Sequence, residues 1–183
     1  YSFISLSPLL QSTTSLPSPT MQVTVTSNDD RAFQVDRQIL KQAGTIETLI
    51  TSMNLDDEDA VAMPIPLPNV DGPTLELVID WLKQHKDDPV REEKEDDGER
   101  DSTNISEQDK AFFKGKDQAT IFDLILGANY LDINGLLEAT TKTVANMIKG
   151  KTPEQIRAQF GIKNDFTPEE EEQIRKENAW CEE

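Results

Sequence analysis

An acidic run between residues 87 and 101 divides this chain into two segments that can contribute to a core. The run holds nine carboxylates and three basic residues, and no apolar periodicity passes through it. A segment of that composition buries too little apolar surface to offset the entropy cost of ordering it. We therefore expect a disordered acidic insertion over residues 87–110, with the folded domain assembled from the segments on either side.

The segment before the insertion combines strand and helix patterns. Apolar and polar residues alternate around the turn-forming segment Ser27–Asp30, which predicts a β-hairpin. From Asp36 onward apolar residues recur every three or four positions, which is the spacing of one helix face. Gly44 interrupts this spacing, so we expect two short helices in succession.

Three prolines at alternate positions, Pro64, Pro66 and Pro68, constrain the next segment. Alternate residues of a strand point their amides to the same side, and proline has no backbone N–H to offer a neighbouring strand. The segment is therefore predicted to be an edge strand. Pro73 suits the first turn of the following helix. The predicted buried face of that helix holds Leu75, Val78, Ile79 and Leu82.

The segment after the insertion is helical in pattern. Asp117 is the predicted N-cap of a helix that is apolar on most sides, so we expect this helix to be buried. Asp132 is predicted to cap the next helix, which continues to Ile148, and Gly150 is placed to end it in a left-handed conformation.

Two similar motifs, Thr152–Gln155 and Thr167–Glu170, then predict two short helices that begin with capping boxes. The last helix, from Pro168 to the end of the chain, has only Ile174 and Trp180 as large apolar residues. Burial of those two contributes about 3–5 kcal/mol, which is too little to order a helix of that length firmly. Trp180 is thus either an interface anchor or folded back onto the domain.

Charge excludes two classes of partner. The chain has 18 Lys and Arg against 35 Asp and Glu, a formal net charge of -17, so a nucleic acid or an anionic membrane surface would repel it. No stretch approaches the roughly 18 consecutive apolar residues that a membrane span requires. Residues 1–20 lack the features of a signal peptide, and we expect a disordered leader or a gene-model artefact there.

The residues do not indicate an active site. His85 ends an amphipathic helix and is expected to be exposed. Cys181 lies beside two glutamates, which disfavour a reactive thiolate. With one cysteine and one histidine, a Cys/His metal site is excluded. We expect no catalytic residue, no metal, no cofactor and no small-molecule substrate.

Several sequence runs nevertheless resemble a known family. The runs are residues 142–153, 163–172 and 175–183, with shorter matches at 64–70, 85–88 and 128–133. In order and spacing the chain resembles the Skp family, the adaptors of cullin–RING ubiquitin ligases that bind F-box proteins, over roughly residues 23–183.

This resemblance implies an α+β fold. A BTB/POZ-like domain, a small sheet with helices, would be formed by residues 21–86 and completed by helices over 111–150. Residues 151–183 would form C-terminal helices that bind an F-box. The resemblance places Asn129 and Tyr130 at the cullin-binding surface. It places the following residues at the F-box-binding surface: Leu137, Val144, Met147, Ile148, Ile156, Phe160, Ile162, Phe166, Ile174 and Trp180.

The function that follows from the resemblance is that of a non-catalytic adaptor in the cytoplasm and nucleus, with F-box proteins and a cullin as partners. Two alternatives remain open at this point. One is a BTB-type homo-oligomer or an elongin-C-like adaptor. The weaker one is an acidic hydrolase, which is disfavoured because the carboxylates cluster in loops and helix starts rather than among apolar residues.

Overall fold

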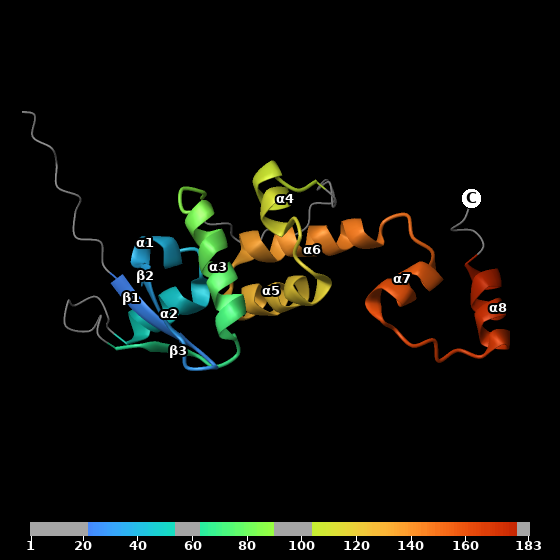
Figure 1. The fold of residues 1–183 in the computed structure, drawn as a ribbon, viewed down its shortest axis with the longest axis horizontal. Helices are drawn as coiled ribbons and strands as arrows, with labels where there is room; N and C mark the ends of the chain where they lie inside the picture. The colour runs from blue at the N-terminus through green and yellow to red at the C-terminus, as the bar shows by residue number, and fades with distance from the viewer. Residues whose placement is uncertain (1–21, 54–62, 90–103, 179–183) are drawn as a thin grey trace, which may run out of the picture.

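The computed structural model describes residues 22–53, 63–89 and 104–178. In these ranges a three-stranded sheet packs with helices α1–α6, and helices α7 and α8 follow at one end of the molecule (Figure 1). The predicted leader and most of the predicted acidic insertion lie outside the described residues.

The sheet has the strand order β2-β1-β3. Strands β1 (Gln22–Ser27) and β2 (Ala32–Asp36) form the predicted antiparallel hairpin. Strand β3 (Ile65–Leu67) pairs in parallel with the other side of β1, so it is an edge strand, as the alternating prolines predicted. Ile65 and Leu67 are fully buried while Pro66 between them is exposed.

The first three helices also follow the sequence pattern. Helix α1 (Arg37–Leu40) and helix α2 (Gly44–Ser52) are the two predicted short helices, and the Asp36 side chain caps α1. Helix α3 (Gly72–Gln84) has proline in its first turn, and all four residues of its predicted buried face are buried. Trp81, which the sequence did not place in the core, is only 3% exposed.

The predicted end of the acidic insertion at residue 110 is wrong. Helix α4 (Glu107–Phe113) begins inside that range, and the Ser106 hydroxyl accepts a hydrogen bond from the Asp109 N–H as its N-cap. Phe112 and Phe113 join the core. The acidic pattern concealed this helix because its buried apolar residues, Phe112 and Phe113, lie only at its C-terminal end.

Helices α5 (Gln118–Leu131) and α6 (Asn134–Ile148) form an adjacent pair. Asp117 caps α5 as predicted, but Asp132 does not cap α6. It has a φ of 55° in the left-handed region and closes α5, and Ile133 takes the N-cap position without a side-chain hydrogen bond. The link between the helices is so short that Asp132 must reverse the chain, which is incompatible with the extended backbone of an N-cap.

Gly127 permits the close packing of α5 against α3. A Cβ atom at this position would lie 3.2 Å from Thr74 Cγ2 and 3.8 Å from Val78 Cγ2. A glycine in a helix interior lowers helix propensity, but here it allows the two backbones to approach. The packing of α5 on α3 fixes the direction of the helix that carries Asn129 and Tyr130, the predicted cullin-binding residues.

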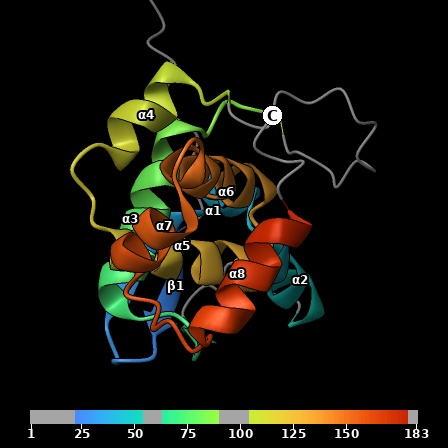
Figure 2. The ribbon, with the colours of Figure 1, turned by 90° about the vertical axis from the view of Figure 1, so that its right-hand side faces the viewer.

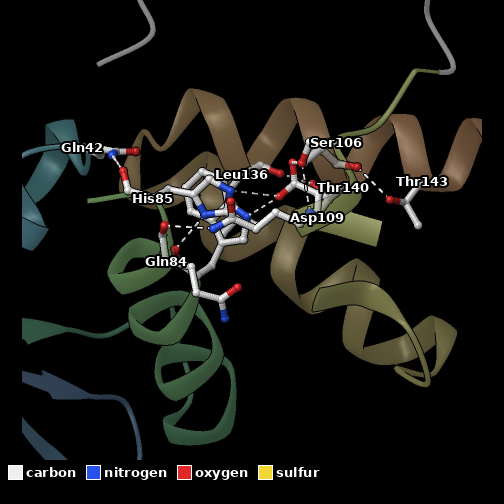
Figure 3. Close-up of polar contacts among 11 residues, drawn as sticks. Gln42, Gln84, His85, Ser106, Asp109, Leu136, Thr140 and Thr143 are labelled. Atoms are coloured by element: carbon white, nitrogen blue, oxygen red, sulfur yellow. Dashed lines mark hydrogen bonds and ion pairs between the residues drawn. The ribbon is translucent and has the colours of Figure 1, made fainter. Parts of the chain in front are cut away.

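His85 is buried, contrary to the prediction of an exposed helix end. It is 5% exposed, and its ring stacks on Trp81 with centroids 3.9 Å apart (Figure 3). Its Nδ1 atom lies 2.9 Å from the Trp81 carbonyl oxygen, and its Nε2 atom lies 3.4 Å from Asp109 Oδ1. The sequence pattern of α3 could not show this burial because the covering residue, Asp109, follows the acidic run.

Asp109 of α4 binds α3 through one carboxylate oxygen and the N-cap of its own helix through the other. Oδ1 accepts a hydrogen bond from Trp81 Nε1 at 2.8 Å, and Oδ2 accepts one from the Ser106 hydroxyl at 2.7 Å. Two side-chain amides also satisfy carbonyls at the C-terminal end of α3: Gln108 donates to Gln84 O, and Gln42 donates to His85 O. This network attaches α4, which follows the acidic run in the sequence, to the C-terminal end of α3, which precedes the run.

We predict that Asp109→Ala lowers the free energy of unfolding by about 2–3 kcal/mol, because it leaves the buried Trp81 Nε1–H without its acceptor. Urea unfolding followed by tryptophan fluorescence measures the effect. Asp123→Ala, at an exposed position of α5, is the control and should change stability by less than about 0.5 kcal/mol. Equal stability of the two variants would show that the network does not hold α4.

Candidate functional site

Burial ends part-way along α6. Leu136, Ala139 and Thr140 are its buried residues, and none of the residues from Thr141 to Asn178 is buried. This stretch includes helix α7 (Pro153–Phe160) and helix α8 (Pro168–Glu177). The last part of the described chain is therefore helical without a core of its own.

We call the surface formed by residues 141–178 the C-terminal face. It carries a row of large apolar residues. Ile162 is 55% exposed, Phe166 49%, Ile174 39% and Ile148 38%. Val144, Met147, Ile156 and Phe160 are half-buried. Soluble proteins seldom leave so many large apolar side chains together on one surface without a binding role.

Local capping explains how these helices form without buried residues. Both predicted capping boxes are present: Thr152 with Gln155 in α7, and Thr167 with Glu170 in α8. Gly161 ends α7 with a φ of 61°, in the left-handed conformation that glycine adopts without strain. The caps satisfy the backbone groups that helix ends leave free.

The capping hydrogen bonds also lower the pKa values of two carboxyl groups at the starts of these helices. Hydrogen bonds from the Thr167 N–H and hydroxyl to Glu170 Oε2, at 2.8 and 2.9 Å, lower the pKa of the Glu170 carboxyl. The pKa of Glu154 is lowered as well, first by the Thr152 hydroxyl and less strongly by the nearby charges of Arg157 and Arg175. Both helices therefore begin with carboxylates that favour their charged form.

The two terminal helices border a groove of about 760 Å³. Its lining combines the apolar Phe166 and Ile174 with the charged Arg157, Glu171 and Arg175. In Figure 2 the viewer faces this end of the molecule, where α7 and α8 lie in front of α5 and α6.

The prediction that α5 is buried on most sides is wrong for two of its residues. Leu126 is 66% exposed and Phe122 is 38% exposed. The Phe122 ring meets the Phe160 ring of α7 with centroids 6.0 Å apart, so Phe122 extends the apolar surface at the base of the C-terminal face. Sequence analysis missed Phe122 because an all-apolar helix does not reveal which side the core leaves uncovered.

The second predicted surface lies at the other end of α5. Asn129 is exposed, and Tyr130 is half-buried against the core. The Thr45 hydroxyl donates to the Tyr130 carbonyl at 2.8 Å, and the Gly44 N–H donates to the Asp132 carbonyl at 3.2 Å. The start of α2 thus satisfies carbonyls at the end of α5 and fixes the backbone that presents Asn129 and Tyr130.

The predicted site residues thus divide between two places. Nine of the ten assigned to the F-box surface are described, and none of these nine is buried. Leu137 is half-buried and packs against the core. Trp180 lies outside the described residues, so its two alternatives remain open.

Two kinds of catalytic arrangement can be checked among the described residues. No group of three or more His, Cys, Asp and Glu residues there could hold a metal ion. The Ser106 hydroxyl donates to Asp109 rather than to His85, so these three residues do not form a nucleophile–base pair. No helix in the described ranges is long and apolar enough to cross a membrane.

Comparisons with known proteins assign the chain to a family. Residues 21–87 match the Skp1 family tetramerisation domain, and residues 134–181 match the Skp1 family dimerisation domain. A Skp1-related protein of Caenorhabditis elegans is 53% identical over 162 residues, which cover 88% of this chain and 92% of the relative. The chain belongs to the Skp1 family.

Two fungal proteins are similar to the chain over nearly the same length. Proteins named E3 ubiquitin ligase complex SCF subunit sconC, from Talaromyces stipitatus and Talaromyces marneffei, are each 47% identical over 161 residues. The match covers 88% of this chain and 97% of each relative. The predicted family and the BTB/POZ-like α+β fold are confirmed.

We predict that α8 loses helix content in acid through its cap. The folded-state pKa of Glu170 lies below its unfolded value, so its stabilisation is fully present above the unfolded pKa and is lost as pH falls through the folded pKa. NMR Cα chemical shifts of α8 against pH measure this loss.

The variant Glu170→Gln is the control, because it copies the neutral Gln155 of the α7 box. Its α8 should keep its helical shifts to lower pH than α8 of the unmodified chain. An identical acid transition in both proteins would show that Glu170 does not support the helix through its charge.

Proposed function

We propose that this Skp1-family protein is a non-catalytic adaptor of an SCF-type E3 ubiquitin ligase, which joins the F-box of a substrate receptor to a cullin scaffold and so supports ubiquitin-dependent protein degradation. The observation that carries the proposal is the C-terminal face, where three helical segments present large apolar residues and bury none. The fungal relatives are named as SCF subunits, which supports the same conclusion.

The C-terminal face suits a helical partner of apolar character. Ile148, Ile162, Phe166 and Ile174 are between 38% and 55% exposed, and an amphipathic helix laid along them would cover the surface that this chain leaves open. Aromatic and aliphatic anchors of this kind dominate interface energies. The ten F-box-binding residues predicted from the sequence remain our proposed contacts, and we add Phe122 to them.

The proposed cullin surface is separate from Phe122, the one proposed F-box contact that lies on the same helix. Phe122 and Tyr130 are eight residues apart in α5, which corresponds to about 12 Å along a helix axis. Phe122 meets α7, and Tyr130 is held near α2 by Thr45. Helix α5 can therefore keep the two proposed surfaces at a fixed separation, because Asn129 and Tyr130 are the proposed cullin contacts and Phe122 adjoins the F-box contact Phe160 of α7.

The proposed contribution to ubiquitin transfer is proximity. An adaptor that holds a receptor and a scaffold in one geometry raises the effective concentration of substrate at the ligase without chemical groups of its own. The proposal assigns no cofactor, nucleic acid, membrane or small-molecule substrate to the chain. We also propose that it acts in the cytoplasm and nucleus, because a chain with one cysteine suits a reducing compartment.

We predict that Ile174→Ala combined with Trp180→Ala weakens F-box binding by about thirtyfold or more, the loss expected when interface anchors are truncated. Titration calorimetry with a recombinant F-box domain measures the affinity. Met63→Ala removes an apolar side chain that is 61% exposed near β3, and as the control it should bind normally. Unchanged affinity of the double variant would contradict the proposed F-box surface.

We predict that Asn129→Lys and Tyr130→Lys each abolish capture of the cullin N-terminal domain and keep F-box binding, because each places a charged side chain where the scaffold would pack. Glu76→Gln, the same change in charge as Asn129→Lys at an exposed site of α3, is the control. Circular dichroism checks the fold, since Tyr130 also packs against the core. Retained cullin binding by the exposed Asn129→Lys variant would contradict the assignment.

A homo-oligomer is the second candidate, because the two matched domains are described as dimerisation and tetramerisation domains. Self-association could cover the C-terminal face with another copy of the chain. Sedimentation equilibrium with and without an F-box domain separates the candidates. The adaptor function predicts that the F-box domain yields a one-to-one complex, whereas an obligate oligomer would keep its own stoichiometry.

A further inference from the structure

Charged groups, rather than apolar packing, connect α7 to α8. An Arg157 Nη2 hydrogen donates to Glu171 Oε1 in an ion pair between the two helices. Asn164, in the loop that joins the helices, donates from Nδ2 to the same oxygen at 3.2 Å. The carboxylate of Glu171, a residue of α8, is thus a common acceptor for α7 and the loop.

A second carboxylate adds to this connection. Glu154 Oε1 lies 3.9 Å from Arg157 Nη2 and 3.9 Å from Arg175 Nη2, so opposite charges alternate from α7 to α8. Neither helix contains a buried residue. Apolar burial, the usual means of fixing two helices against each other, therefore contributes little to their relative position.

The pair between Arg157 and Glu171 is the best shielded part of this cluster. Their side chains are 20% and 32% exposed, whereas those of Lys176 and Glu172, paired within α8, are 74% and 67% exposed. Exposed pairs contribute little, but a pair that is partly removed from water is screened less by salt. Both residues of the shielded pair line the groove beside Phe166 and Ile174.

We propose that Arg157 and Glu171 are positioning residues that hold α7 and α8 at the separation an F-box requires. The inference rests on the proposed function and deepens it. Pre-forming a groove lowers the cost of ordering it when the partner binds. In this arrangement the ion pair sets the distance between the helices, and the apolar residues beside it supply the contact with the partner.

The test is a charge-swap cycle. Arg157→Glu and Glu171→Arg each place like charges together, and the double variant Arg157→Glu/Glu171→Arg restores an opposite pair with the order reversed. Lys176→Glu and Glu172→Arg are the matched controls, because they make the same changes in charge at the exposed pair within α8. All five variants lie outside the core, so the fold of residues 22–140 is expected to be unaffected.

The first measurement needs no partner. Spin labels at Ala158→Cys and Gln173→Cys, in a Cys181→Ser background, report the distance between α7 and α8 in the full chain by pulsed electron paramagnetic resonance. We expect each single charge reversal to broaden the distance distribution, the double variant to narrow it again, and the controls to match the unmodified protein. Broad distributions in every protein, or a single reversal without effect, would overturn the proposal.

The second measurement is the affinity for a recombinant F-box domain. We expect about a five- to tenfold loss in each single reversal, recovery in the double variant, and less than a twofold change in the controls. A loss in the double variant as large as the sum of the single losses would overturn the positioning role. If the unmodified chain does not bind the F-box domain, the proposed function fails, while the distance measurement still decides whether the ion pair positions the helices.

Discussion

Thr140, near the middle of α6, is the last buried residue in the described part of the chain. Up to that point the sheet and helices α1–α6 share one apolar core, to which the first half of α6 contributes. Beyond it, helix formation depends on capping boxes, a left-handed glycine and ion pairs. Such interactions define a helix locally but contribute little to global stability.

The boundary at Thr140 separates two parts of the chain that have different roles. The folded part supplies a rigid support, in which α3 and α5 approach closely at Gly127 and the start of α2 is hydrogen-bonded to the end of α5. The C-terminal part carries large apolar residues that the described chain does not bury, and we propose that a partner covers them. Helix α5 belongs to this support and also contacts α7 through Phe122. It therefore sets the position of the proposed cullin surface relative to the proposed F-box surface.

The sequence predicted those features that depend on local chemistry. Pro64, Pro66 and Pro68 specify an edge strand because the missing amides act within the segment itself, and the two threonine caps act over three residues. The burial of His85 could not be predicted in this way, because Asp109 reaches it across the acidic run. Asp132 was assigned wrongly because the length of the link to α6, rather than the residue type, decided its backbone conformation.

The sequence also predicted only part of the proposed binding surface. The scarcity of apolar residues around Ile174 indicated correctly that α8 has no core of its own. The surplus of apolar residues in α5, by contrast, hid the exposed Phe122 and Leu126, since residues that face a core and residues that face a partner have the same composition. Only the packing distinguishes them, and the identity of the ten proposed F-box contacts remains a prediction.

Hydrogen exchange of the full chain, followed by mass spectrometry with and without an F-box domain, tests the central claim most directly. If the C-terminal helices depend on a partner, amides of residues 153–177 will exchange at least tenfold faster than those of α3 and α5 in the free chain, because local opening there requires little free energy, and they will become protected in the complex. Protection of α7 and α8 equal to that of α5 without any partner would contradict the account.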